Sequence, residues 1–95
     1  MLKRIVKMSF QEDQISPFIA KFEANKDKIR NFPGCRHVEL LQVKDNPQMF
    51  FTFSIWDDEE ALDAYRHSEL FKGIWTVTKL MFDSKPEAWS LDFIG

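Results

Sequence analysis

The chain has 95 residues, including ten phenylalanines and three tryptophans, and a formal net charge of −2 at pH 7. This length suits one hydrophobic core, so residues 1–95 are predicted to form a single domain. There is no basic stripe and no apolar run of membrane-spanning length, which argues against nucleic acid and membrane as partners. The first residues lead into a strand pattern rather than a signal segment, and we expect a cytoplasmic protein.

The N-terminal third of the chain predicts a strand and then a helix. Alternation over residues 2–10 indicates the strand, in which Arg4 interrupts an otherwise apolar parity. Apolar residues at helical spacing over residues 15–32 indicate the helix, with Asp13 or Ser16 as its expected N-cap.

The middle of the chain predicts two strands joined by a turn. Gly34 is expected to end the helix in a left-handed conformation. The ten residues after it alternate, with Cys35, His37 and Glu39 on one parity. Residues 49–56 then form a dense aromatic strand with large apolar side chains on both faces, so this strand should be covered on two sides.

The remainder of the chain predicts two helices and a last strand. The pair Asp57-Asp58 offers an N-cap for a helix whose apolar stripe includes Tyr65. Ser68 can cap a second helix, whose amphipathic stripe includes Phe71 and Trp75. Residues 87–95 alternate as the final strand.

The order strand-helix-strand-strand-helix-strand predicts an α+β fold of the ferredoxin-like βαββαβ type. In it an antiparallel four-stranded sheet carries its helices on one face. The other face would be bare, yet the strands have apolar residues on both parities. Leaving such a face in water would cost many kcal/mol at ~25 cal/mol per Å². We therefore expect a homodimer formed through the open sheet face, which is a dimeric α+β barrel.

Several motifs together resemble the antibiotic biosynthesis monooxygenase (ABM) family of dimeric α/β-barrel proteins. They are Phe32-Pro33-Gly34-Cys35 at the end of the first helix and Trp56 at the end of the third strand, before an acidic helix start. The run Tyr65-Arg66-His67-Ser68-Glu69-Leu70-Phe71 follows. The ending Lys85-Pro86-Glu87-Ala88-Trp89-Ser90 is similar to that of a subgroup of small bacterial members. The resemblance spans nearly the whole chain.

This resemblance implies oxygenation of small aromatic or quinol-like molecules, often with no metal or organic cofactor. In such a reaction a base deprotonates an electron-rich substrate in a dry pocket, and the resulting anion donates an electron to O₂. The protein supplies shape, low polarity and a titratable group. Accordingly, neither a metal nor a cofactor is expected.

One branch of the family degrades haem, and the resemblance does not extend to its motif. The branch uses an Asn on the first strand, a Trp after the third strand and an axial His. The corresponding positions here fall near Lys7, on Tyr65 and on Trp75. Haem degradation is disfavoured, because an indole cannot coordinate iron as an imidazole does.

His37 and Tyr65 are the candidate catalytic residues. His37 shares its parity with Glu39, which could orient the ring, so it is either a base facing the cavity or a strand histidine at the dimer seam. Tyr65 lies on an apolar stripe, and its hydroxyl needs a partner or a ligand. His67, at a helix end, is expected to be a surface residue, and Cys35 a small buried filler.

Four further residues are candidates for binding the substrate. Arg4 could anchor an acidic or phenolate group, the alternative being an ion pair with Glu39 or Glu87. Phe71 and Trp75 are candidate pocket walls or packing residues, and Trp56, at a strand end, is a candidate either for the pocket wall or for the subunit interface.

Three functional hypotheses follow from the sequence. The first is a cofactor-independent monooxygenase acting on a small aromatic or quinol-like molecule. The second is a non-catalytic homodimer that carries or senses a small hydrophobic ligand, and the third is a structural dimer. A cavity beside a His or Tyr side chain would favour the first, a purely apolar cavity the second, and no cavity the third.

Overall fold

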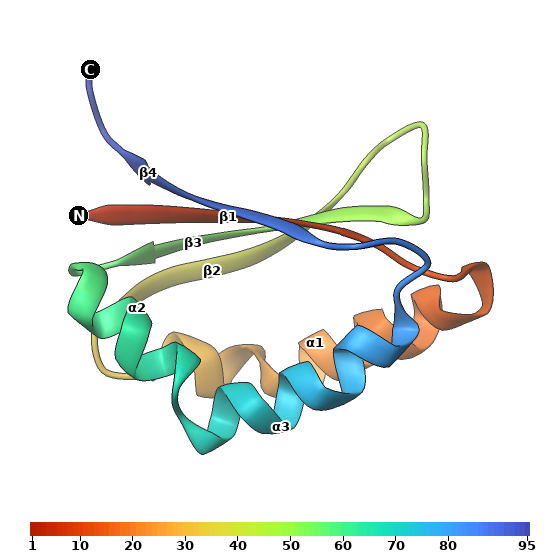
Figure 1. The fold of residues 1–95 in the computed structure, drawn as a ribbon, viewed down its shortest axis with the longest axis horizontal. Helices are drawn as coiled ribbons and strands as arrows, with labels where there is room; N and C mark the ends of the chain where they lie inside the picture. The colour runs from red at the N-terminus through yellow and green to blue at the C-terminus, as the bar shows by residue number, and fades with distance from the viewer.

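Four strands form one antiparallel sheet in the computed structural model, which describes residues 1–95 (Figure 1). The strand order is β2-β3-β1-β4, so that β1 and β3 are central and β2 and β4 are the edges. The elements in chain order are β1 Leu2–Ser9, η1 Glu12–Gln14, α1 Ile15–Arg30, β2 Cys35–Gln42, β3 Met49–Trp56, α2 Glu59–Arg66, α3 Glu69–Thr78, η2 Lys79–Met81 and β4 Glu87–Asp92.

The predicted ferredoxin-like α+β fold is confirmed by this topology. Helices α1, α2 and α3 all lie on one face of the sheet, and the other face carries no helix (Figure 1). No helix combines the length and the apolar character that crossing a membrane would require.

The predicted caps are confirmed for α2 and α3 but not for α1. The carboxylate of Asp58 accepts a hydrogen bond from the backbone N–H of Ala61 at 2.9 Å, and Ser68 Oγ accepts from Phe71 N–H at 3.1 Å. The start of α1 has no side-chain cap. The prediction of Asp13 or Ser16 there was wrong, because a 3₁₀ turn leads directly into α1 and both residues are already helical.

Side-chain alternation divides the sheet into a helix-facing side and an open side. On β1, Arg4 and Met8 face the helices, so Ile5 between them points to the open side. On β2 a bulge lies between Cys35, which pairs with Trp56, and His37, which pairs with Ile55. The bulge turns Cys35 and His37 to opposite faces, although their parity predicted one face.

The hydrophobic core lies where β1 and β3 meet α1. Its buried members are Met8, Phe10, Phe18 and Phe50. The rings of Phe10 and Phe18 stack with centroids 4.0 Å apart, and Phe50 meets both edge-on. Phe82 contacts Phe10 from the segment that leads to β4, so the aromatic cluster joins both halves of the chain.

Gly34 brings the start of β2 against α2. It has a φ of 87°, as the sequence predicted, and its carbonyl accepts a hydrogen bond from Asp57 N–H at 2.8 Å. A Cβ at this position would overlap the Cβ of Ala61 in α2. Only glycine therefore satisfies both the backbone conformation and the close approach of the helix.

We predict that Gly34→Ala lowers the free energy of unfolding by about 2 kcal/mol or more, from left-handed strain and overpacking together. Gly73→Ala is the matched control, because Gly73 lies in α3 with open space around it. There alanine should raise the stability by roughly 0.5–1 kcal/mol through helix propensity. Urea unfolding of both variants tests this, and equal effects would contradict the close approach at Gly34.

Candidate functional site

A cavity of about 500 Å³ lies between the helix-facing side of the sheet and the helices. Its volume falls within the range of small-molecule sites. Residues from β1, β2, β3 and β4 form its floor, and α1, α2 and α3 form its roof. Five of the six predicted site residues line it: Arg4, Trp56, Tyr65, Phe71 and Trp75.

One wall of the cavity is a continuous series of aromatic rings. The Trp56 indole stacks on the Tyr65 ring with centroids 4.9 Å apart and planes inclined by 29°. Tyr65 meets Phe71 edge-on at 5.2 Å, and Phe71 stacks on Trp75 at 5.7 Å. The wall therefore combines the end of β3 with α2 and α3, and its flat faces suit an aromatic ligand.

Trp56 positions a hydroxyl at this wall. The indole is 1% exposed, and its Nε1–H donates to Ser54 Oγ at 2.9 Å. The Ser54 hydroxyl lines the cavity and donates no hydrogen bond to another protein group. It is therefore free to donate to a ligand.

Tyr65 brings a second hydroxyl to the cavity. Burial raises the pKa of Tyr65, and the nearby Cys35 raises it further. The phenol consequently stays neutral at physiological pH and can donate a hydrogen bond but cannot act as a base. None of the hydrogen bonds within the protein uses this hydroxyl, although the ring is held by its stacking on Trp56.

Arg4 supplies a charge at the cavity and forms no ion pair. Its Nη1 donates to Ser90 Oγ on β4 at 3.0 Å. Burial lowers the pKa of Arg4, and repulsion by Arg66 lowers it further. The alternative expectation of an ion pair with Glu39 or Glu87 was wrong: Glu39 contacts His37 on the open side, and Glu87 makes no ion pair.

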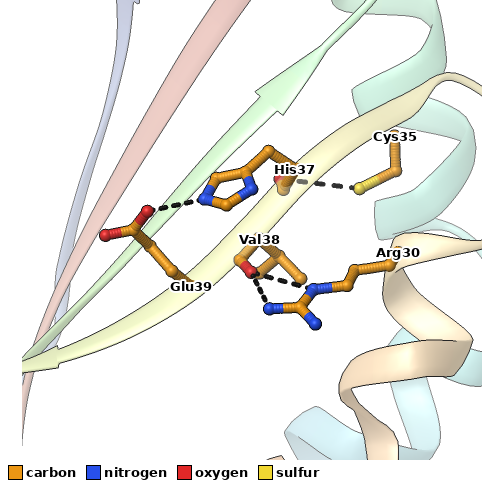
Figure 2. A network of polar contacts seen from close by, with 5 residues as sticks. All are labelled: Arg30, Cys35, His37, Val38 and Glu39. Atoms are coloured by element: carbon orange, nitrogen blue, oxygen red, sulfur yellow. Dashed lines mark hydrogen bonds and ion pairs between the residues drawn. The ribbon is translucent and has the colours of Figure 1, made fainter.

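His37 lies on the open side of the sheet, away from the cavity (Figure 2). Its Nε2 is 2.6 Å from Glu39 Oε1, and its ring approaches Phe53. The neighbouring Val38 faces the helices, and its carbonyl accepts two hydrogen bonds from Arg30 of α1, at 3.0 and 3.2 Å. Because β2 bulges before His37, the geometry does not place this residue as a base in the cavity.

His67 is exposed, as the sequence predicted, and it also lines the cavity. Its Nδ1 lies 2.8 Å from the backbone oxygen of Asp63 and must donate to it, so the neutral ring keeps an unprotonated Nε2. Arg66 also borders the cavity at this junction of α2 and α3. In the sequence, the only indication that Arg66 and His67 lie at the cavity was their position directly before the Ser68 cap.

The arrangement can bind a flat ligand, donate hydrogen bonds to its oxygens from Ser54 and Tyr65, and accept a proton at His67. Nowhere do three His, Cys, Asp or Glu side chains gather in a way that could hold a metal ion.

Comparison with known proteins gives one family. The family model described as antibiotic biosynthesis monooxygenase (ABM) matches residues 1–75 of this chain. Among curated proteins, no sequence matches the chain.

Similar solved structures include one described as an antibiotic biosynthesis monooxygenase, with 21% identity, a TM-score of 0.93 and 100% of both chains covered. A conserved protein from Methanosarcina mazei Go1 is 20% identical, with a TM-score of 0.90 over 95% of this chain and 89% of that one. Rv0793 from Mycobacterium tuberculosis is 19% identical, with a TM-score of 0.90 over 99% and 95%. At these identities the likeness shows the fold alone.

The raised pKa of Tyr65 predicts how stability depends on pH. Below the ordinary tyrosine pKa of about 10, the folded and unfolded chains both hold the phenolic proton. Above it the unfolded chain loses this proton first, so stability falls as the pH rises. Because Tyr65 is the only tyrosine, tyrosinate absorbance reports this residue alone.

We expect tyrosinate absorbance of the folded protein to appear well above the usual pH, and urea unfolding to show a stability loss that begins at about pH 10 and grows as the pH rises further. Tyr65→Phe removes the titrating group and should remove its part of that loss. A normal tyrosinate titration in the folded protein would contradict the burial of this hydroxyl.

Proposed function

We propose, since this chain belongs to the antibiotic biosynthesis monooxygenase (ABM) family, that it is a cofactor-independent monooxygenase. Its substrate is a small aromatic or quinol-like molecule bound in the cavity between sheet and helices. The observation that carries the proposal is an aromatic wall beside the neutral Tyr65 hydroxyl and the imidazole of His67, whose Nδ1 is bonded to the Asp63 carbonyl.

The first chemical step is removal of a proton from the bound substrate. His67 Nε2 accepts it, and the hydrogen bond from Nδ1–H to the Asp63 carbonyl holds the ring in the required tautomer. Tyr65 and Ser54 donate hydrogen bonds to the developing oxyanion. The substrate anion then gives one electron to O₂, and the two radicals combine to a peroxide.

The substrate supplies all the electrons for this reaction. For an anthrone-like CH₂ group, one oxygen atom becomes the new carbonyl oxygen and the other leaves as water with the two hydrogens. The contribution of the protein is an apolar cavity that orients the rings and excludes water from the anion. Trp56, Phe71 and Trp75 form the walls for this purpose.

A second candidate function is a dimeric carrier or sensor of a hydrophobic ligand. The mostly apolar lining of the cavity favours it, since binding alone needs no base. A purely structural dimer has no use for an open cavity of this size. Catalytic turnover distinguishes the enzyme from the carrier.

Oxygen uptake by the metal-free protein with hydroquinones and anthrone-like phenols tests the proposal. We expect catalysed uptake that falls at least tenfold, about 1.4 kcal/mol of barrier, in Tyr65→Phe and in His67→Ala. Incorporation of isotopically labelled O₂ into the product distinguishes oxygenation from simple oxidation to hydrogen peroxide.

His37→Ala is the matched control, because it removes the other histidine from the opposite side of the sheet. Its rate should stay within about twofold of the wild type. Uptake no faster than the buffer blank throughout the panel would leave the carrier. A loss of oxygen uptake in His37→Ala but not in His67→Ala would instead assign the catalytic base to His37, on the open side of the sheet.

We propose further that the protein is a cytoplasmic homodimer associated through the open side of the sheet. Apolar side chains from all four strands lie on this side: Ile5, Leu41, Phe51, Phe53, Ile55, Trp89 and Leu91. Trp89 is 44% exposed and Leu41 47% exposed in the single chain. Pairing two such faces removes them from water, which supports a barrel of two sheets.

Phe53→Glu and Trp89→Glu should each turn the dimer into a monomer, because a carboxylate would be buried without a partner in the seam. Sedimentation velocity measures the change. Leu80→Glu is the control, since Leu80 is 73% exposed in η2, away from the sheet, and the dimer should persist. A wild-type protein that stays monomeric at micromolar concentration would overturn the proposed seam.

A further inference from the structure

Two arginines line the cavity, and Arg4 forms an ion pair with no carboxylate. Arg4 reaches the cavity from β1, and Arg66 from the end of α2. Both side chains line the same cavity, and the charge of Arg66 lowers the pKa of Arg4. The partner of Arg4 is the neutral Ser90 hydroxyl, and that of Arg66 is Asp63, at 3.7 Å on the exposed flank of α2.

Such an arrangement has an energetic cost in the empty protein. A partly buried guanidinium loses hydration, and a second one beside it adds repulsion. Glu87 also borders the cavity but forms an ion pair with neither arginine. A bound anion would offset both effects, and the planar guanidinium fork matches a carboxylate with paired N–H donors.

The positions of the arginines relative to the aromatic wall define the ligand. Arg4 lies on the same strand face as the cavity floor, and Arg66 directly follows Tyr65 of the wall. A ligand with its rings against Tyr65 and Phe71, which are only partly buried, can direct a charged substituent to both arginines. We propose that the cavity selects an aromatic acid, whose carboxylate is held by Arg4 and Arg66. This subsite would define the substrate class of the proposed monooxygenase. Only the reaction of the bound acid, and not its binding, rests on that proposed function.

Anaerobic calorimetry with gentisate and its methyl ester tests the subsite without turnover. The two probes share the hydroquinone ring and differ in the negative charge. We expect gentisate to bind at least about tenfold more tightly than the ester to the wild type. Arg4→Gln and Arg66→Gln should each reduce this preference about tenfold while leaving ester affinity within about twofold. Arg4→Lys should keep part of it, because the charge remains and the fork is lost.

Arg36→Gln is the matched control, since it removes one positive charge at a residue that pairs with Asp57 outside the cavity. It should keep the preference. Thermal unfolding verifies that the variants fold, and gentisate should raise the melting temperature of the wild type more than that of Arg4→Gln.

Equal binding of acid and ester, a preference that survives both substitutions, or no gentisate binding at millimolar concentration would each overturn the subsite. These outcomes are distinct from failure of the monooxygenase. Selective gentisate binding without oxygen uptake keeps the subsite and removes the enzyme. Oxygen uptake with neutral hydroquinones, without any preference for binding the acid over the ester, keeps the enzyme and removes the subsite.

Discussion

The stacking of Trp56 on Tyr65 is the interaction on which the geometry of the site depends. Trp56 ends a central strand, and Tyr65 lies on the helix that begins three residues later. Gly34 lets Ala61, one helical turn before Tyr65, pack directly against the start of β2. The first turn of α2 is therefore held by a close backbone approach and its second turn by a ring stack. With α2 fixed in this way, residues of α2 and α3 line the cavity opposite the sheet.

The cavity gathers features that lower the stability of the folded chain. Protein interiors are close-packed, and an unfilled volume forfeits dispersion contacts along its whole lining. Here the lining also holds hydroxyls without protein acceptors, at Ser54 and Tyr65, and a partly buried Arg4 without a counter-charge. The aromatic core around Phe10, at the other end of the sheet, is tightly packed by contrast. Since one ligand would reverse all of these costs together, they are best explained as features of a binding site.

The sequence was sufficient for the element order, because each element carries a local signal. The caps at Asp58 and Ser68 and the left-handed Gly34 are set by one or two neighbouring residues. The side of the sheet on which His37 lies is not local. It depends on a bulge in the pairing of β2 with β3, and one extra residue in a strand reverses every later side chain. Likewise, His67 reaches the cavity from the junction of α2 and α3, whose position over the sheet helical spacing alone does not define.

Because side chains alternate along β1, this strand contributes both to the proposed ligand site and to the proposed dimer seam. Arg4 points into the cavity, and the next residue, Ile5, points to the open side where a second copy would pack. The cavity lies on the helix-facing side of the sheet and the proposed seam on its open side, so the two share strands but not a face. A partner on the open side would instead restrain β1 and β3, and with them the positions of Arg4, Ser54 and Trp56. Association would then act on the chemistry through the rigidity of the shared strands.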